Sequence, residues 1–212
     1  MAAERTEPRG LVWLPTGVVI VALLAPAFLP WVVRRKEDAM ARELHEVGVA
    51  RPLAAARRAA FERTISTRAA YLISRNPSFL ERAAHWQAQH DLEAKKLADA
   101  AVWLGPEARA QLAALDRDYD AFQRGRRERD QRPLTPEEEF REMPAINARA
   151  EALFAGYDRL DAALVAEGDH WQGELERFGR IGWFTNLFLS ALGVAAVVTV
   201  AGLTRREQRA RA

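Results

Sequence analysis

The pattern of apolar and polar positions divides the chain into three parts. Residues 10–33 and residues 181–203 contain no charged side chain, whereas the stretch between them mixes charges with apolar residues. A helix needs about 20 consecutive apolar residues to cross a bilayer, and both uncharged runs are long enough. We therefore predict transmembrane helices at residues 11–33 and 181–203, flanked by tails at residues 1–10 and 204–212.

The first apolar run has an alternative interpretation as a cleaved signal peptide. Trp13 and Trp31 lie near its two ends, as aromatic anchors do at membrane interfaces. Its prolines are tolerated in membrane helices. The run is longer than the apolar core of a typical signal peptide, and residues 34–36 (Arg-Arg-Lys) follow it directly. These features favour an uncleaved anchor.

The second apolar run has an alternative interpretation as the buried core helix of a globular domain. No other part of the chain is suited to surround such a helix. The tail after it carries four arginines and one acid, which predicts that residues 204–212 stay in the cytoplasm. Two spans place both tails on the same side. The central domain, residues 34–180, is then expected outside the cytoplasm. The basic residues 34–36 favour the opposite orientation, but long domains are translocated largely regardless of charge.

Apolar residues at helical spacing predict four helices in the central domain. The first runs from the membrane to about Arg75, with an expected kink near Gly48 and Pro52. Asn76 is the expected N-cap of the second, which spans Pro77 to Leu104. The seam of the third helix, which starts at Pro106, consists of Ala108, Leu112, Leu115, Tyr119 and Phe122.

The fourth helix is expected to begin near Met143 or Pro144 and to continue into the second span. Its seam includes Ile146, Ala150, Leu153, Tyr157, Leu160 and Leu164, and Glu167 breaks the pattern. Residues 124–132, rich in arginine, are expected to form an exposed loop. A capping box at residues 135–138 predicts a short helical piece there.

These elements predict an all-α fold, an antiparallel four-helix bundle whose first and last helices are continuous with the two transmembrane helices. A change in bundle packing could then slide or rotate one span against the other. Such coupling is the physical basis for a signalling hypothesis.

Composition narrows the possible functions. The net charge is +2, acids and bases interleave, and no basic block lies beside stacking aromatics, so nucleic acid is not an expected partner. The absence of cysteine excludes disulfides and thiolate chemistry. No catalytic triad, phosphate-binding loop or dinucleotide fingerprint occurs. We expect neither an enzyme nor a cofactor.

Candidate binding residues each have a simpler structural interpretation. His45, His85 and His90 lack metal-binding spacing, and we expect no metal site. His170 is a candidate pH-responsive group. Three tryptophans could line a pocket between helices, although aromatic residues at such positions usually belong to a core: Trp86, Trp103 and Trp171. Four arginines could bind an anionic ligand or simply form a solvated face: Arg57, Arg58, Arg68 and Arg75. The possible ligand-facing residues are Arg68, Arg75 and Trp86.

Residues 71–83 read YLISRNPSFLERA. This segment resembles the link between the first two helices of CHASE3-type sensory domains, which typically reads Tyr-Leu-Leu-Thr-Gly-Asp-Pro-x-Phe-Leu-Glu, and the layout is similar to that of chemoreceptor four-helix bundles. The matching residues are Tyr71, Leu72, Pro77, Phe79, Leu80 and Glu81, with Asn76 at the place of the family's Asp. Arg75 replaces the family's glycine, and Ala69 and Ala70 replace the usual Arg-Gly.

The resemblance implies an extracytoplasmic sensor of a ligand or stress, a homodimer, located in a bacterial inner membrane. Only nine residues follow the second span, without a kinase or methyl-accepting module. The expected function is therefore that of a membrane-anchored sensory accessory protein that passes a helix shift to a histidine kinase or chemoreceptor. The rival hypothesis is a non-signalling structural or assembly protein of an envelope complex.

Overall fold

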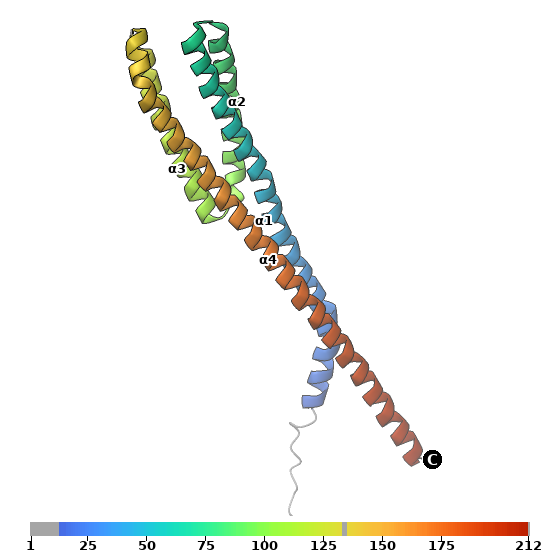
Figure 1. The fold of residues 1–212 in the computed structure, drawn as a ribbon. Helices are drawn as coiled ribbons and strands as arrows, with labels where there is room; N and C mark the ends of the chain where they lie inside the picture. The colour runs from blue at the N-terminus through green and yellow to red at the C-terminus, as the bar shows by residue number, and fades with distance from the viewer. Residues whose placement is uncertain (1–12, 133–134, 212) are drawn as a thin grey trace, which may run out of the picture. The chain divides into compact units, whose positions relative to one another are not determined.

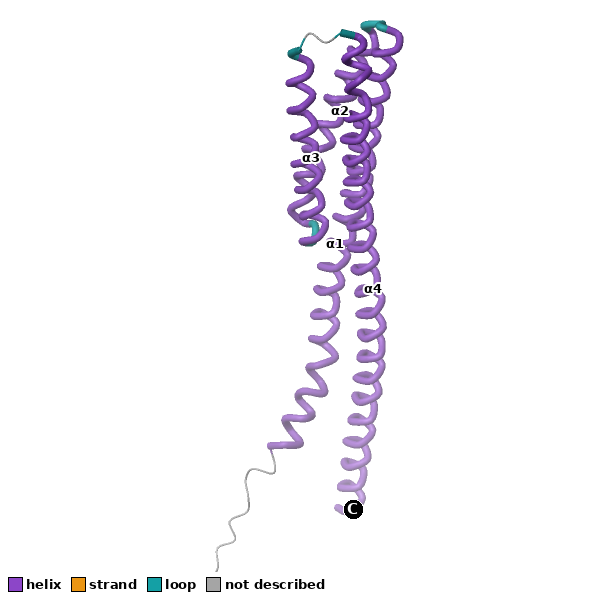
Figure 2. Tube along the Cα trace, turned by 60° about the vertical axis from the view of Figure 1, so that its left-hand side comes forward, coloured by secondary structure: helices purple, strands orange, loops and turns teal. Residues whose placement is uncertain are grey.

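The computed structural model describes residues 13–132 and 135–211 and builds them almost entirely from helices (Figures 1 and 2). The α-helices are α1 (Trp13–Ser74), α2 (Ser78–Ala100), α3 (Pro106–Asp130) and α4 (Pro136–Arg211), and a 3-10 turn, η1 (Ala101–Trp103), follows α2. No strand occurs in these two ranges. The all-α prediction is confirmed. The predicted tail at residues 1–10 and the first two residues of the first predicted span lie outside the described residues.

The junction between α1 and α2 ends the first helix close to where the sequence predicts. Arg75 has a φ of 54°, and its N–H donates to the carbonyl oxygen of Tyr71 at 2.7 Å. This is the left-handed cap that commonly closes a helix. The helix α2 begins at Ser78 with Pro77 at the N-cap position, one residue later than predicted. The side-chain oxygen of Asn76 nevertheless accepts from the N–H of Ser78 at 3.0 Å.

The connection before α3 explains the break in the apolar pattern of α4. The second helix is shorter than predicted, because α2 ends at Ala100 and η1 follows it. The backbone is extended at Leu104 and Gly105, and α3 begins at Pro106 as predicted. The N–H of Gly105 donates to Oε1 of Glu167 at 2.6 Å. Glu167 therefore interrupts the apolar seam because it satisfies a loop donor.

Two predicted boundaries between α3 and α4 are wrong. Residues 124–130, expected in a loop, continue α3 to Asp130. Arginine and glutamate favour helix, and an Arg126–Asp130 pair lies along its last turns at 3.7 Å. The start of α4 lies at Pro136 rather than near residue 143, so Pro144 lies inside the helix.

The N-terminus of α4 is stabilised by the predicted capping box. Thr135 Oγ1 accepts from the N–H of Glu138 at 3.3 Å, and Oε2 of Glu138 accepts from the N–H of Thr135 at 2.8 Å. These bonds lower the pKa of Glu138. Residues 137–139 are all acidic and complement the helix dipole, as predicted. The first helix, α1, continues through Gly48 and Pro52, the residues where a kink is expected.

Residues 42–172 form one compact unit and contain the hydrophobic core. At its centre is Phe61 of α1, which is 1% exposed. Its ring centroid lies 5.6 Å from that of Phe122 in α3 and 5.3 Å from that of Phe154 in α4. All four α-helices contribute to the buried cluster, whose larger members are Phe61, Leu97, Leu112, Leu115, Tyr119, Phe122, Leu153, Tyr157, Leu160 and Leu164. The predicted seam of α3 and the central part of the predicted seam of α4 are therefore buried.

The second unit consists of residues 1–41 and 173–212. Its part of α4 exposes large apolar side chains, among them Trp183 at 62% and Phe188 at 65%. Within the described residues, α4 alone is long and apolar enough to cross a membrane, and only 6% of its most apolar stretch is buried. This exposure supports membrane association of residues 181–203.

Candidate functional site

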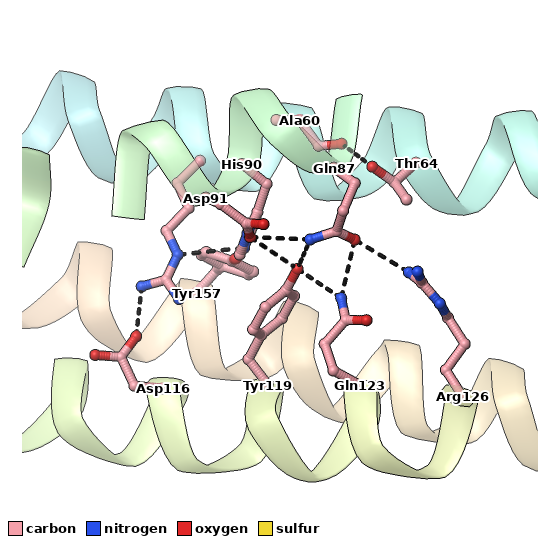
Figure 3. Close-up of polar contacts among 11 residues, drawn as sticks. Ala60, Thr64, Gln87, His90, Asp91, Asp116, Tyr119, Gln123, Arg126 and Tyr157 are labelled. Atoms are coloured by element: carbon pink, nitrogen blue, oxygen red, sulfur yellow. Dashed lines mark hydrogen bonds and ion pairs between the residues drawn. The ribbon is translucent and has the colours of Figure 1, made fainter. Parts of the chain in front are cut away.

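A polar network joins side chains from all four α-helices inside the core (Figure 3). It contains Arg57 of α1, three residues of α2, four of α3 and Tyr157 of α4. Its members are Arg57, Gln87, His90, Asp91, Asp116, Tyr119, Gln123, Arg126 and Tyr157. Arg57 and His90 are 2% and 1% exposed, so the centre of the network is shielded from solvent.

Arg57 fixes the protonation of His90. Nε of Arg57 donates to Nε2 of His90 at 3.2 Å. A guanidinium has only donors, so Nε2 must be the unprotonated nitrogen of the ring. Nδ1 then carries the proton and donates to Oδ1 of Asp91 at 3.1 Å. Burial, reinforced by the charge of Arg57, lowers the pKa of His90 to about 4 despite the hydrogen bond to Asp91.

The buried guanidinium of Arg57 is compensated by several groups. Its Nη1 lies 2.7 Å from Oδ1 of Asp116. Its centre lies 5.7 Å from the ring of Tyr119 and 6.0 Å from that of Tyr157, within range of a cation–π interaction. The hydroxyl of Tyr157 lies 2.8 Å from Nε2 of His90, within hydrogen-bond distance. Burial raises the pKa of both tyrosines, so their hydroxyls remain neutral.

A second branch of the network leads from α2 to Arg126. The amide nitrogen of Gln87 donates to Asp91 at 2.9 Å and also bonds the hydroxyl of Tyr119. Its oxygen accepts from Gln123 at 2.9 Å and from Nη1 of Arg126 at 3.1 Å. Arg126 is thus held from α2 through a neutral amide, and no carboxylate neutralises it there.

Arg126 also lines a cavity of about 410 Å³ between the four helices. This volume is within the range of small-molecule sites. Its apolar lining comes from every helix: Ile65, Leu72, Leu80, Phe122, Met143 and Ile146. Its charged lining is mainly basic: Arg68, Arg126, Arg129 and Arg132, with Asp130 and Glu139. The cavity therefore combines apolar walls with an excess of guanidinium groups.

The guanidinium groups of the cavity are only loosely paired. Oδ2 of Asp130 lies 3.6 Å from Nη2 of Arg68 and 3.7 Å from Nε of Arg126, so one carboxylate serves two arginines beyond hydrogen-bond distance. Nε of Arg126 is buried without a hydrogen bond. Arg129 is half-buried and forms no ion pair with the described residues. Burial, together with repulsion from Arg68, lowers the pKa of Arg126.

The two acids of the lining differ in how they are compensated. Glu139 pairs with Arg75 at 2.8 Å, which raises the pKa of Arg75. Its charge is therefore neutralised from outside the cavity, whereas Asp130 has to compensate both Arg68 and Arg126. The net positive charge is therefore concentrated at Arg68 and Arg126, which share Asp130, and at Arg129.

Only some of the site residues predicted from the sequence line this cavity. Arg68, Tyr71, Leu72 and Leu80 line it. The other residues of the motif do not line it and belong to the junction and the first turn of α2: Asn76, Pro77, Phe79 and Glu81. Arg75, which follows α1, does not line it either.

The tryptophans do not line the cavity. Trp86 is half-buried beneath Arg63, whose guanidinium lies 4.4 Å from the indole ring, while Trp103 is 54% exposed. Trp171 packs against the core. Trp171 thus fits the core interpretation, whereas Trp103 lies neither in the core nor in this cavity.

The histidine and arginine candidates have separate positions. No cluster suited to a metal ion occurs among the described histidines and acids. Arg57 and Arg58 are each engaged, with Asp116 at 2.7 Å and Asp158 at 2.6 Å. His90 is buried in the network, and His170 lies beside Trp171 at 5.2 Å between ring centroids.

Arg126 and Arg129 are not among the site residues predicted from the sequence, because residues 124–132 are expected there to form a loop. A signal was present. The seam of α3 continues from Tyr119 and Phe122 to these two arginines with the same spacing of three and four residues. The core-facing positions of α3 thus become basic towards its C-terminus.

Comparisons with known proteins identify no relative of this chain. No family model matches it, and neither curated proteins nor solved structures contain a match.

Proposed function

We propose that this protein is a membrane-anchored sensory accessory protein. Spans at residues 11–33 and 181–203 anchor it, and residues 34–180 form an antiparallel four-helix bundle outside the cytoplasm. The cavity between the helices receives the stimulus. A change in helix packing passes to a partner such as a histidine kinase or chemoreceptor.

The observation that carries this proposal is the composition of α4. This one helix, Pro136–Arg211, supplies Glu139, Met143 and Ile146 to the cavity and also contains the exposed apolar stretch. A helix transmits a displacement along its length because its backbone hydrogen bonds make it stiff. In this proposal, α4 passes a displacement at the cavity to residues 181–203.

The polar network restricts the bundle to a few distinct arrangements of its helices. Arg126 belongs both to the cavity and to the network that reaches Arg57 and His90. Buried hydrogen bonds have few alternative arrangements, since an unpaired group in the core costs about 1–3 kcal/mol. A cavity occupant that changes the contacts of Arg126 would therefore favour one packing over another. Shifts of about 1–2 Å between helices are typical of such transitions.

A pair of reporter fusions tests the membrane topology. Alkaline phosphatase fused after Gln131 is expected to be active, because the fusion point lies outside the cytoplasm, and phosphatase fused after Ala212 is expected to be inactive. Green fluorescent protein at the same two points should give the opposite pattern. Reversal of both patterns would contradict the proposed orientation.

Photo-crosslinking from the C-terminal tail, followed by mass spectrometry, tests the signalling role. Recovery of a kinase or receptor would support sensing. Recovery of an envelope-assembly complex alone would instead support the structural alternative.

A further inference from the structure

The positive charge of the cavity lacks a matching anion. Arg68 and Arg126 share Asp130 at 3.6 and 3.7 Å, and Arg129 is unpaired with any described residue. Half-buried cations retain a desolvation penalty that a bound anion would reduce. The buried Nε of Arg126 also lacks a hydrogen bond. The described carboxylates therefore leave an excess of positive charge in the cavity, which an anionic ligand would neutralise.

The apolar walls define the rest of that ligand. Ile65 and Leu72 of α1, Phe122 of α3, and Met143 and Ile146 of α4 line the same space as the arginines. A small inorganic anion would leave these surfaces in contact with water. An anion with an apolar body would bury them and gain hydrophobic free energy in proportion to the area covered.

The carboxylate of Asp130 favours a monoanion over a dianion. Asp130 remains close to Arg68 and Arg126 and repels a dianion such as a phosphate monoester. A carboxylate has one charge and two oxygens that match the planar donors of a guanidinium. We propose that the cavity binds an amphiphilic monocarboxylate, with its carboxylate at Arg126 and Arg129 and its apolar body against Leu72, Phe122 and Ile146. This assignment names the ligand class of the proposed sensor and rests on that proposed function for its biological meaning.

Isothermal titration calorimetry on the full chain in lipid nanodiscs tests the assignment, with empty nanodiscs as the reference. 4-Phenylbutyrate is the probe, because it carries one carboxylate on an apolar body. Its amide, 4-phenylbutyramide, has nearly the same shape without the charge. We expect the acid to bind with one site per chain and the amide at least about tenfold more weakly, since a charge-assisted hydrogen bond is lost. Equal affinities, or no saturable binding of the acid, would overturn the assignment.

Two arginine variants on α3 locate the site. Arg129→Gln removes a cavity guanidinium that has no ion pair with the described residues, so no described carboxylate is left unpaired. Arg127→Gln removes an exposed arginine on the same helix that does not line the cavity. We expect Arg129→Gln to weaken 4-phenylbutyrate binding about tenfold and Arg127→Gln to leave it within about twofold. Equal effects of the two variants would overturn the placement.

Two further ligands test the chemical class. Acetate has the charge without the apolar body and is expected to bind far more weakly than 4-phenylbutyrate. Phenyl phosphate has an apolar body with a second charge, and tighter binding of this compound than of 4-phenylbutyrate would overturn the carboxylate assignment in favour of a phosphate ester.

Different experimental outcomes would contradict the ligand assignment and the proposed function. Selective binding of the acid without a change in helix packing would support the ligand class and contradict the sensory function. A change in packing on filling the cavity, together with equal binding of acid and amide, would contradict the ligand class alone.

Discussion

Nε of Arg57 lies 3.2 Å from Nε2 of His90, and both side chains are almost completely buried. The donor-only guanidinium requires a neutral imidazole at this point. A protonated His90 would place two positive charges in contact inside the core. The relationship therefore makes the stability of the helical domain depend on pH.

The stability of the domain is expected to fall as the pH drops below the ordinary range of histidine. The pKa of His90 is lowered from 6.5 to about 4 in the folded chain. Above pH 6.5 both folded and unfolded chains carry a neutral His90, and its full contribution is present. Between pH 6.5 and 4 the unfolded chain takes up a proton that the folded chain does not. The free energy of unfolding should thus decrease by about 1.4 kcal/mol per pH unit, or about 2 kcal/mol by pH 5.

Denaturant unfolding followed by circular dichroism at pH 7.5 and pH 5 measures this difference. His90→Gln should remove most of the dependence, because an amide does not titrate in this range. His85→Gln, at an exposed position in the same helix, is the control and should retain the pH dependence of the unmodified chain. Retention of the full dependence in the His90 variant would show that another group is responsible.

Loss of the partner of Arg57 is expected to destabilise the core. Asp116→Asn removes the carboxylate 2.7 Å from a guanidinium that is 2% exposed. Because solvent reaches the half-exposed carboxylate, we expect a cost of about 1–2 kcal/mol rather than that of a fully buried pair. Asp158→Asn breaks the exposed pair with Arg58 and should cost at most about 0.5 kcal/mol. Unfolding free energies that are equal for the two variants would contradict the importance of the buried charge.

Truncation of the central aromatic residue should have the largest effect on stability. Phe61→Ala removes a ring surrounded by Phe122, Phe154 and Tyr157, and a buried Phe→Ala substitution costs about 3–5 kcal/mol. Phe140→Ala, at a position that is 81% exposed, should change the unfolding free energy by less than about 0.5 kcal/mol. A cost near that of the control would place Phe61 outside the cooperative core.

The end of α1 carries a strained residue. Arg75 has a φ of 54°, a conformation that glycine adopts without steric cost. In a Glu139→Gln background, which removes the ion pair with Arg75, we expect Arg75→Gly to raise the unfolding free energy by about 0.5–1 kcal/mol. Ala70→Gly, within the same helix, should lower it by about 1 kcal/mol. Destabilisation by both substitutions would contradict the left-handed cap.

Periodicity was sufficient to predict the helices and much of their buried face. The apolar seam of α3 through Tyr119 and Phe122 is buried as predicted, and so is the seam of α4 from Ala150 to Leu164. Local chemistry predicted the capping box at Thr135 and the start of α3 at Pro106. These features depend on residues close together in the sequence, which is why the sequence reveals them.

The remaining features depend on contacts between distant residues. In the sequence Glu167 is only a break in an apolar seam, but in the fold it accepts from the N–H of Gly105, 62 residues away. Buried His90 could be understood only with Arg57, Asp91 and Tyr157 around it. The charged composition of residues 124–132 predicts an exposed loop for Arg126 and Arg129, although α3 includes both residues. Their place on the cavity depends on how far α3 continues, which the charged composition obscured.

The most direct test of the account measures whether filling the cavity moves α1 relative to α4. The chain contains no native cysteine, so His45→Cys and Asp169→Cys, at exposed positions of α1 and α4, can be spin-labelled selectively. Double electron–electron resonance in lipid bilayers would compare the empty chain, the chain with 4-phenylbutyrate, and Met143→Trp, which fills the cavity without a ligand. We expect the distance distribution to shift by about 1–2 Å with either occupant. Superimposable distributions in all three samples, with binding verified, would contradict a sensory role for this domain.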